Sequence, residues 1–412
     1  MLSEQILKLV SAVLVTIYIA RHLGPNDFGI LSYALAIAMV FMAVTRLGME
    51  SILVRDIAKY PEQAQEYMST ALSLMLIASA VGLLALTGTV YLIEESNQTR
   101  LYILIISTGI IFQPLLVIEY NFQAQVKAKY SSLAKSAALS ISATSKIILI
   151  LLDGELYQFA IMYALDHLII ALTLLAMHIK KRQTTFTNRI KVELIKPLLK
   201  SAWPMILAAL AATLYMRADQ VMIKNMLGAH ELGLYAAAIK IYEGWILVPY
   251  VLSISLLPAI VKMKSQSEKE YKNNMSMLFS LLIWTSACVA IVATTFGESI
   301  INMTYGSEYK SASTVLGIVM WASIFAALGS VTARYLTVEG MERKIATRTF
   351  IGLICNILLN LVLIPIYGIE GAAVATLITL FVANYAINYT DKSLKQLIEI
   401  CNHSIIFRWL KK

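Results

Sequence analysis

The chain has 412 residues, of which 58% are hydrophobic and only 14% are charged, and its mean hydropathy is +0.71. A soluble domain carries about 25% charged residues, so this composition excludes an ordinary cytosolic enzyme, a disordered chain and a fibrous repeat. The net charge of +9 raises the question of nucleic acid or anionic lipid as a partner. The cysteines lie far apart, at Cys288, Cys355 and Cys401, and their spacing predicts neither a disulfide framework nor a metal site.

Long apolar runs with few charges are typical of transmembrane helices, because only a helix or a closed barrel satisfies its backbone hydrogen bonds inside lipid. Twelve such runs follow one another along the chain. They cover residues 5–23, 30–54, 70–93, 101–120, 131–152, 156–178, 200–224, 233–261, 275–297, 312–337, 345–366 and 371–389. The intervals between them are too short to fold as soluble domains. The sequence therefore predicts an all-α polytopic membrane protein with twelve transmembrane helices.

Lysine and arginine are distributed very unequally between the two sets of alternating loops. The set that includes both termini carries 23 of these residues, whereas the opposite set carries four, Arg21, Arg100, Lys224 and Lys310. Because lysine and arginine accumulate on the cytoplasmic side, both termini are expected in the cytoplasm. This distribution explains the basic charge, so no nucleic-acid partner is expected. The tail after residue 391 mixes apolar and cationic residues, which fits either a helix along the cytoplasmic face or a frayed basic end.

The longest basic loop divides the twelve predicted helices into two sets of six. The predicted parts are an N-terminal lobe (1–178), a basic cytoplasmic linker (179–199), a C-terminal lobe (200–390) and a cytoplasmic tail (391–412). Ile19–Ile30 can be aligned with Ile223–Leu234 at an offset of 204 residues, with matching Leu-Gly pairs, acidic residues and second glycines. This similarity favours a parallel repeat, as in alternating-access transporters; shared turn chemistry between helix–glycine–helix turns is the alternative.

Two motifs resemble a known family. The segment Arg21–Gly29, RHLGPNDFG, is similar to the R-x-L-G-P-x-x-F-G turn after the first span of the polysaccharide (O-antigen) flippases. That family shares a superfamily with the multidrug and toxin extruders and the lipid II flippases. Asn356–Thr376 is similar to the family's N-x-x-x-N-x-x-L-I-P-x-Y-G-x-x-G-A-A-x-A-T stretch between the last two spans, and Tyr305–Tyr309 gives a weaker third match. Together with the twelve-span plan, the resemblance covers nearly the whole chain.

The resemblance implies a flippase that moves a polyisoprenyl-pyrophosphate-linked oligosaccharide, for O-antigen or another surface polysaccharide, from the cytoplasmic to the outer leaflet of the inner membrane. It implies alternating access without a cofactor, with membrane lipid around the protein and a polysaccharide polymerase as a candidate partner. The alternative in the same superfamily is a multidrug-type exporter, which an acid-rich cavity would favour. An enzyme is not expected, because the outer loops are short and the sequence contains no P-loop and no DxD motif.

Ionisable residues inside the predicted spans are costly in lipid unless they face a cavity or a partner. Arg46, Lys146, Arg217 and Lys240 are therefore predicted to bind an anionic substrate such as a pyrophosphate headgroup. Tyr242 and Trp245, close to Lys240, are candidates for stacking on sugars. Structural ion pairs are the alternative for each cation. Two of the four have an acidic residue within one helical turn: Arg46 has Glu50, and Lys240 has Glu243.

Two intramembrane carboxylates are candidates for a coupling-ion site. Asp166 is predicted near the middle of the sixth span and Asp219 in the outer half of the seventh. Either can bind a proton in one conformation and release it in the other. A fixed ion pair with Lys146 or Arg217 is the alternative. Lys135, nearer the cytoplasmic end of its span, is expected to extend to the membrane surface.

Overall fold

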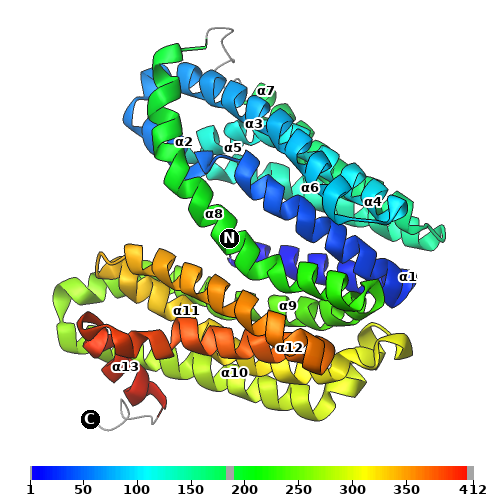
Figure 1. Cartoon of the computed structure of the whole chain (residues 1–412). Helices are drawn as coiled ribbons and strands as arrows, with labels where there is room; N and C mark the ends of the chain where they lie inside the picture. The colour runs from blue at the N-terminus through cyan, green and yellow to red at the C-terminus, as the bar shows by residue number, and fades with distance from the viewer. Residues whose placement is uncertain (1, 182–189, 406–412) are drawn as a thin grey trace. The chain divides into compact units, whose positions relative to one another are not determined.

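The computed structural model describes residues 2–181 and 190–405 (Figure 1). No β-strand occurs in these two stretches, which confirms the predicted all-α class. The helices, in chain order, are α1 (Leu2–Thr45), α2 (Met49–Lys59), α3 (Ala64–Ile93), α4 (Asn97–Ser107), α5 (Val117–Ala124), α6 (Ala128–Leu151), α7 (Leu156–Lys180), α8 (Val192–Leu227), α9 (Ala229–Gln266), α10 (Glu268–Thr304), α11 (Ala312–Val338), α12 (Arg343–Asn384) and α13 (Lys395–Ile405). Short 3₁₀ segments join some of them, namely η1 (Pro61–Gln63), η2 (Thr108–Leu116), η3 (Ser307–Tyr309), η4 (Ala386–Thr390) and η5 (Lys392–Leu394).

Ten helical stretches of the described chain are long and apolar enough to cross a membrane. The protein is therefore a multi-pass membrane protein. Two of the ten, Val13–Lys59 and Arg343–Thr390, are 47 and 48 residues long, and each overlaps two of the predicted runs. Both contain a glycine with positive φ at the predicted turn: Gly24 has φ 74° and Gly368 has φ 58°. A residue with a side chain rarely adopts this conformation, so glycine allows the helix axis to change there.

Two predicted helices are broken where the hydropathy pattern is continuous. The run over 30–54 is interrupted after Thr45, because Leu47 and Gly48 both have positive φ, 53° and 58°. The run over 101–120 changes from α4 into the 3₁₀ segment η2, which contains Pro114, before α5 begins. Proline has no backbone N–H to continue the α-helical hydrogen bonds. Residues 182–189 of the predicted linker lie outside the described residues, while α7 and α8 extend into its two ends.

The chain forms two compact units. The first unit consists of residues 14–23 and 30–217, and the second unit consists of residues 1–13, 24–29 and 218–412. In the first unit, apolar residues of α2, α3 and α5 pack against Leu198 and Ala202 of α8. In the second unit, buried apolar residues of α10, α11 and α13 form a common cluster.

A reciprocal contact between two glycine turns holds residues 24–29 within the second unit. A Cβ atom added to Gly29 would lie 1.8 Å from the carbonyl oxygen of Ala229. A Cβ atom added to Gly233 would likewise lie 1.8 Å from the carbonyl oxygen of Pro25. The two contacts involve the segments that the sequence aligns at an offset of 204 residues. Because glycine has no Cβ atom, each turn can pack directly against the backbone of the other.

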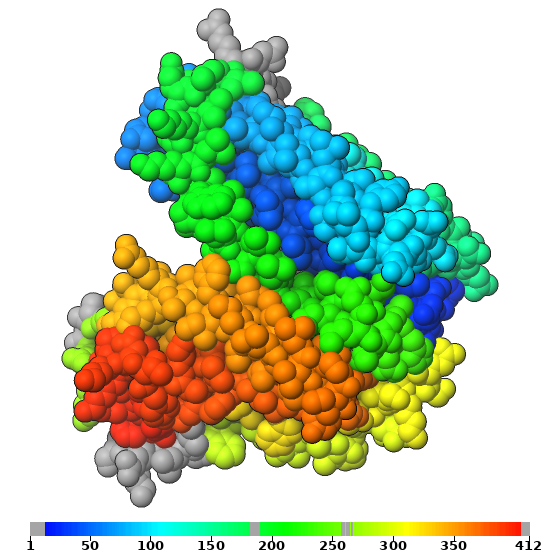
Figure 2. All heavy atoms as spheres, viewed as in Figure 1, coloured from blue at the N-terminus to red at the C-terminus, as the bar shows by residue number. Residues whose placement is uncertain are grey.

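The C-terminal segment is a docked helix up to Ile405. Leu397, Ile400 and Cys401 of α13 are buried against α10 and α11. The hydroxyl of Ser280 donates a hydrogen bond to the carbonyl of Ser404 at 2.6 Å. Figure 2 shows this segment, in red, on the surface of the second unit. Residues 395–405 of the predicted tail are helical and not frayed, their position along the cytoplasmic face stays a prediction, and residues 406–412 lie outside the described residues.

Candidate functional site

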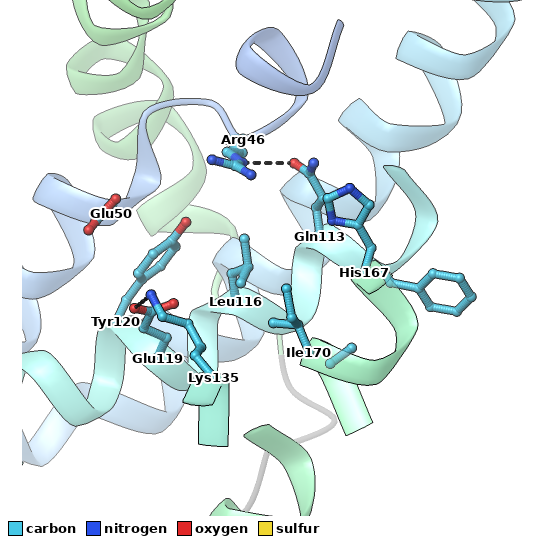
Figure 3. A pocket seen from close by; sticks show the side chains of 11 residues that line it. Arg46, Glu50, Gln113, Leu116, Glu119, Tyr120, Lys135, His167 and Ile170 are labelled. Atoms are coloured by element: carbon cyan, nitrogen blue, oxygen red, sulfur yellow. Dashed lines mark hydrogen bonds and ion pairs between the residues drawn. The ribbon is translucent and has the colours of Figure 1, made fainter. Parts of the chain in front are cut away.

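A polar cavity of about 200 Å³ lies within the first unit (Figure 3). Its lining comes from the break between α1 and α2 and from α2, η2, α5, α6 and α7. The lining residues are Arg46, Glu50, Phe112, Gln113, Leu116, Glu119, Tyr120, Lys135, His167, Ile170 and Ala171. Both helix interruptions described above contribute to this polar cavity. The first places Arg46 at the end of α1, and the second places Gln113 in a 3₁₀ segment, a conformation that often marks a functional position inside a helix.

Arg46 and Gln113 form the donor end of the polar cavity. The Nε of Arg46 donates a hydrogen bond to the Oε1 of Gln113 at 3.1 Å. Because a guanidinium has only donors, this bond directs the amide oxygen of Gln113 toward Arg46 and leaves its nitrogen facing elsewhere. Gln113 is 2% exposed, and its Nε2 has no partner among the described residues. The terminal nitrogens of Arg46 likewise make no hydrogen bond to the part of the chain that the structure describes.

The opposite end of the polar cavity carries two carboxylates. Glu119 is buried and paired with the ammonium of Lys135 at 2.6 Å. Gln123 donates its amide nitrogen to Glu119 at 3.2 Å and to Glu50 at 3.5 Å. Figure 3 shows Gln113 and His167 on one side, and Glu50, Tyr120, Glu119 and Lys135 on the other. Lys135, expected to extend to the membrane surface, is therefore an ion-paired lining residue.

A second charged group lies between α6 and α7 of the first unit. The ammonium of Lys146 contacts the carboxylate of Asp166 at 2.5 Å, and the hydroxyl of Ser142 donates to the same carboxylate. The Lys146 ammonium also lies 3.9 Å from the centre of the Tyr163 ring, which adds a cation–π contact. The Lys146 side chain is only 7% exposed. Its charge is thus neutralised inside the helix bundle, as the ion-pair alternative expects.

The other predicted site residues lie on α8 and α9. Lys240 and Glu243 pair at 2.8 Å within one turn, which is the local neutralisation that their spacing predicts. Tyr242 is buried, and Trp245 is partly buried. Asp219 is buried and accepts a hydrogen bond from the Tyr235 hydroxyl at 2.5 Å. The hydrogen bond from the Tyr235 hydroxyl therefore stabilises the Asp219 carboxylate.

The structure divides the predicted site residues between the two units. Arg46, Lys146 and Asp166 belong to the first unit, and Arg217 is its last residue. The remaining predicted residues belong to the second unit, namely Asp219, Lys240, Tyr242 and Trp245. The predicted local pair of Arg46 with Glu50 is not formed in the described structure, because the helix break separates the two residues and Arg46 bonds to Gln113 instead.

Sequence reasoning missed Gln113 and His167 as lining residues. A glutamine inside an apolar run and next to a proline was the available signal for the first. Opposite charges in consecutive spans were the signal for the pair of Glu119 and Lys135. The described residues contain no group of three or more histidine, cysteine or acidic side chains that could hold a metal ion.

Comparison with known proteins places these features in context. A family model described as polysaccharide biosynthesis protein matches residues 1–264, and one described as MatE matches residues 204–362. The chain is 24% identical over 401 residues to the capsular polysaccharide biosynthesis protein CapF of Staphylococcus aureus, with 95% of this chain and 98% of that protein covered. It is 20% identical to a putative O-antigen transporter of Shigella flexneri, with 87% and 88% covered.

Among solved structures, the lipid II flippase MurJ in an inward closed conformation matches with a TM-score of 0.76. The sequence identity is 17%, and the match covers 99% of this chain and 91% of that one. At this identity the likeness establishes the fold.

Proposed function

This chain belongs to the polysaccharide biosynthesis protein family, and we propose that it is a flippase for a polyisoprenyl-pyrophosphate-linked oligosaccharide. The oligosaccharide is a unit of O-antigen or another surface polysaccharide, and it moves from the cytoplasmic to the outer leaflet of the inner membrane. The family match over residues 1–264 carries this proposal. The names of the relatives, a capsular polysaccharide biosynthesis protein and a putative O-antigen transporter, support the same pathway.

The architecture that we propose for this function has twelve transmembrane helices in two six-helix lobes, 1–178 and 200–390, related by a parallel repeat. The helix breaks at Gly24 and Gly368 support the count of twelve, since each divides a stretch long enough for two crossings. Positive φ at both Gly24 and Gly228, together with the reciprocal contact of the turns that follow them, supports the repeat. Alternating access between two lobes needs no covalent chemistry, so we propose a transporter and not an enzyme.

The charged residues have distinct proposed roles. Arg46, Lys146, Arg217 and Lys240 are the proposed contacts to the substrate. Arg46 is the strongest of these, because Lys146 and Lys240 are each neutralised by a carboxylate. Tyr242 and Trp245 are proposed to contact sugars. Asp166 and Asp219 are proposed coupling-ion residues, and a polysaccharide polymerase is a proposed partner.

A multidrug-type exporter is the second candidate function. The MatE family model matches residues 204–362, which favours it for that part of the chain. The lining of the polar cavity argues against a cationic drug, because its two carboxylates are balanced by Arg46 and Lys135. The lipid-linked oligosaccharide therefore remains the better substrate.

Deletion of the gene tests the proposed function. We expect the lipid-linked oligosaccharide to accumulate in the cytoplasmic leaflet, where a membrane-impermeant lectin reaches it only in inside-out vesicles. Expression of the intact chain from a plasmid should restore access in right-side-out vesicles. If the oligosaccharide reaches the outer leaflet equally well without this chain, the proposed function is wrong.

A further inference from the structure

The polar cavity of the first unit offers a buried donor that the described chain leaves unused. Gln113 is 2% exposed, and its amide nitrogen has no partner among the described residues. Buried polar groups in native proteins are nearly always hydrogen-bonded, and leaving such a bond unmade is destabilising. The terminal nitrogens of Arg46, which is bonded to Gln113, are also available. The amide nitrogen of Gln113 and the terminal nitrogens of Arg46 are therefore neighbouring donors without an acceptor among the described residues.

The type of acceptor follows from donor geometry. A guanidinium presents parallel N–H groups that match the two oxygens of a carboxylate or phosphate. The amide nitrogen of Gln113 adds a further donor beside it. The donor end of the polar cavity is thus suited to an oxyanion.

The charge of the lining distinguishes between the two oxyanions. Arg46 and Lys135 are balanced by Glu50 and Glu119, so these four side chains together have no net charge. A pyrophosphate carries several negative charges and would be brought close to two carboxylates, which is unfavourable. A single carboxylate needs only the donor end. Hydroxyl groups at the other end of the same molecule can donate to Glu50 and Glu119.

Size and lining restrict the ligand further. About 200 Å³ is the scale of one sugar ring, and it is too small for an oligosaccharide or a polyisoprenyl chain. Tyr120 provides aromatic surface for the C–H groups of such a ring (Figure 3). We propose that the polar cavity binds one acidic sugar residue of the transported oligosaccharide, with its carboxylate on Arg46 and Gln113 and its hydroxyls toward Glu50 and Glu119. This inference rests on the proposed function and names the substrate class of that site.

Binding of sodium glucuronate to the purified full-length protein in detergent micelles tests the proposal, measured by saturation-transfer NMR. We expect glucuronate to bind about tenfold or more tightly than glucose, because glucose lacks the carboxylate. Gln113→Glu keeps the acceptor for Arg46 but adds a negative charge, and it should weaken glucuronate binding by a similar factor. Arg46→Lys removes the paired donors and should also weaken it. Arg55→Lys is the matched control, since Arg55 is exposed, pairs with Asp56 and does not line the polar cavity.

Several results would overturn the proposal. Equal binding of glucose and glucuronate would mean that no carboxylate is recognised. Displacement of glucuronate by inorganic pyrophosphate at equal concentration would make the polar cavity a headgroup site. Unchanged binding in both the Arg46 and the Gln113 variants would place the ligand elsewhere. Failure of glucuronate to bind, with lipid-linked oligosaccharide still stranded in the deletion strain, would remove the sugar subsite and leave the flippase function intact. Selective binding of glucuronate, in a case where the deletion strain does not strand the lipid-linked oligosaccharide, would keep the sugar subsite and exclude the proposed flippase function.

Discussion

At the residue scale, the ion pair of Lys146 and Asp166 separates a structural role from a coupling role. Removing one partner of a buried pair leaves an uncompensated charge and typically costs about 3–5 kcal/mol. If the pair is structural, Asp166→Asn should lower the unfolding temperature in detergent and the abundance in the membrane, because Lys146 keeps its charge. Ser142→Ala, which removes only one hydrogen bond to the carboxylate, should cost about 1 kcal/mol.

Transport by the same Asp166 variant tests the coupling role. At a coupling site the variant should fold normally and lose its dependence on an imposed pH gradient. If Asp166→Asn protein is abundant and its transport still follows the gradient, Asp166 has neither role.

The sequence identified the charged residues inside the membrane-spanning helices more reliably than it predicted which residues they contact. The pair of Lys240 and Glu243 could be predicted, because both lie on one uninterrupted helix. The partner of Arg46 could not be predicted, because positive φ at Leu47 and Gly48 turns the chain inside an apolar run. Its actual partner, Gln113, lies 67 residues away on a 3₁₀ segment. Hydropathy detects which residues are unusual in lipid, and backbone breaks decide what they contact.

At the element scale, the reciprocal glycine contact predicts a matched pair of sensitive positions. Gly29→Ala and Gly233→Ala each place a Cβ atom 1.8 Å from a carbonyl oxygen, so the two turns must separate. Overpacking of this kind typically costs about 1–3 kcal/mol, measured as a loss of thermal stability. The double variant should cost less than the sum, because both changes break one contact.

Gly88→Ala is the control for this pair of substitutions. Gly88 lies inside α3, and a Cβ atom there meets nothing within 4 Å. The substitution should be neutral or stabilising by up to about 1 kcal/mol, because alanine favours a helix. Equal stability of the Gly29, Gly233 and Gly88 variants would contradict a tight contact between the turns.

The ion pair of Lys344 and Asp391 predicts how acid affects α13. The carboxylate of Asp391 accepts hydrogen bonds from Lys344 at 2.5 Å and from Ser393, and these bonds lower the pKa of Asp391 from 3.8 to about 2. A lowered carboxyl pKa contributes stability that is complete above about pH 4 and is lost as the pH falls through 2. We expect amide exchange in residues 392–405, corrected for its intrinsic rate, to rise over that range while α10 stays protected.

Asp391→Asn should show the faster exchange already at pH 5, with little further change in acid. Glu399→Gln, on the exposed face of α13, is the control and should keep the native pH profile. A wild-type profile in the Asp391 variant would show that another group governs the acid response of α13.

At the scale of the whole molecule, the fold class followed directly from composition. A chain with 14% charged residues and long apolar runs has to bury its backbone polar groups in helices inside lipid. The division into two units comes from which helix faces pack together, and hydropathy carries no information on this. Residues 24–29 illustrate the difference, since they belong to the second unit through contacts with a turn two hundred residues later.

The orientation of the chain in the membrane is the last prediction. Lysine and arginine on the two sets of loops number 23 and four, so the loop near Asp153 is expected outside and Lys181 inside. Single cysteines placed at Asp153, Lys181 and Lys310, in a variant without the native cysteines, can be labelled in intact cells by a membrane-impermeant maleimide. The two outer positions should react, whereas the cysteine at residue 181 should react only after the membrane is made permeable. Labelling of residues 153 and 181 from the same side would exclude an odd number of crossings between them and would contradict α7 as a transmembrane helix.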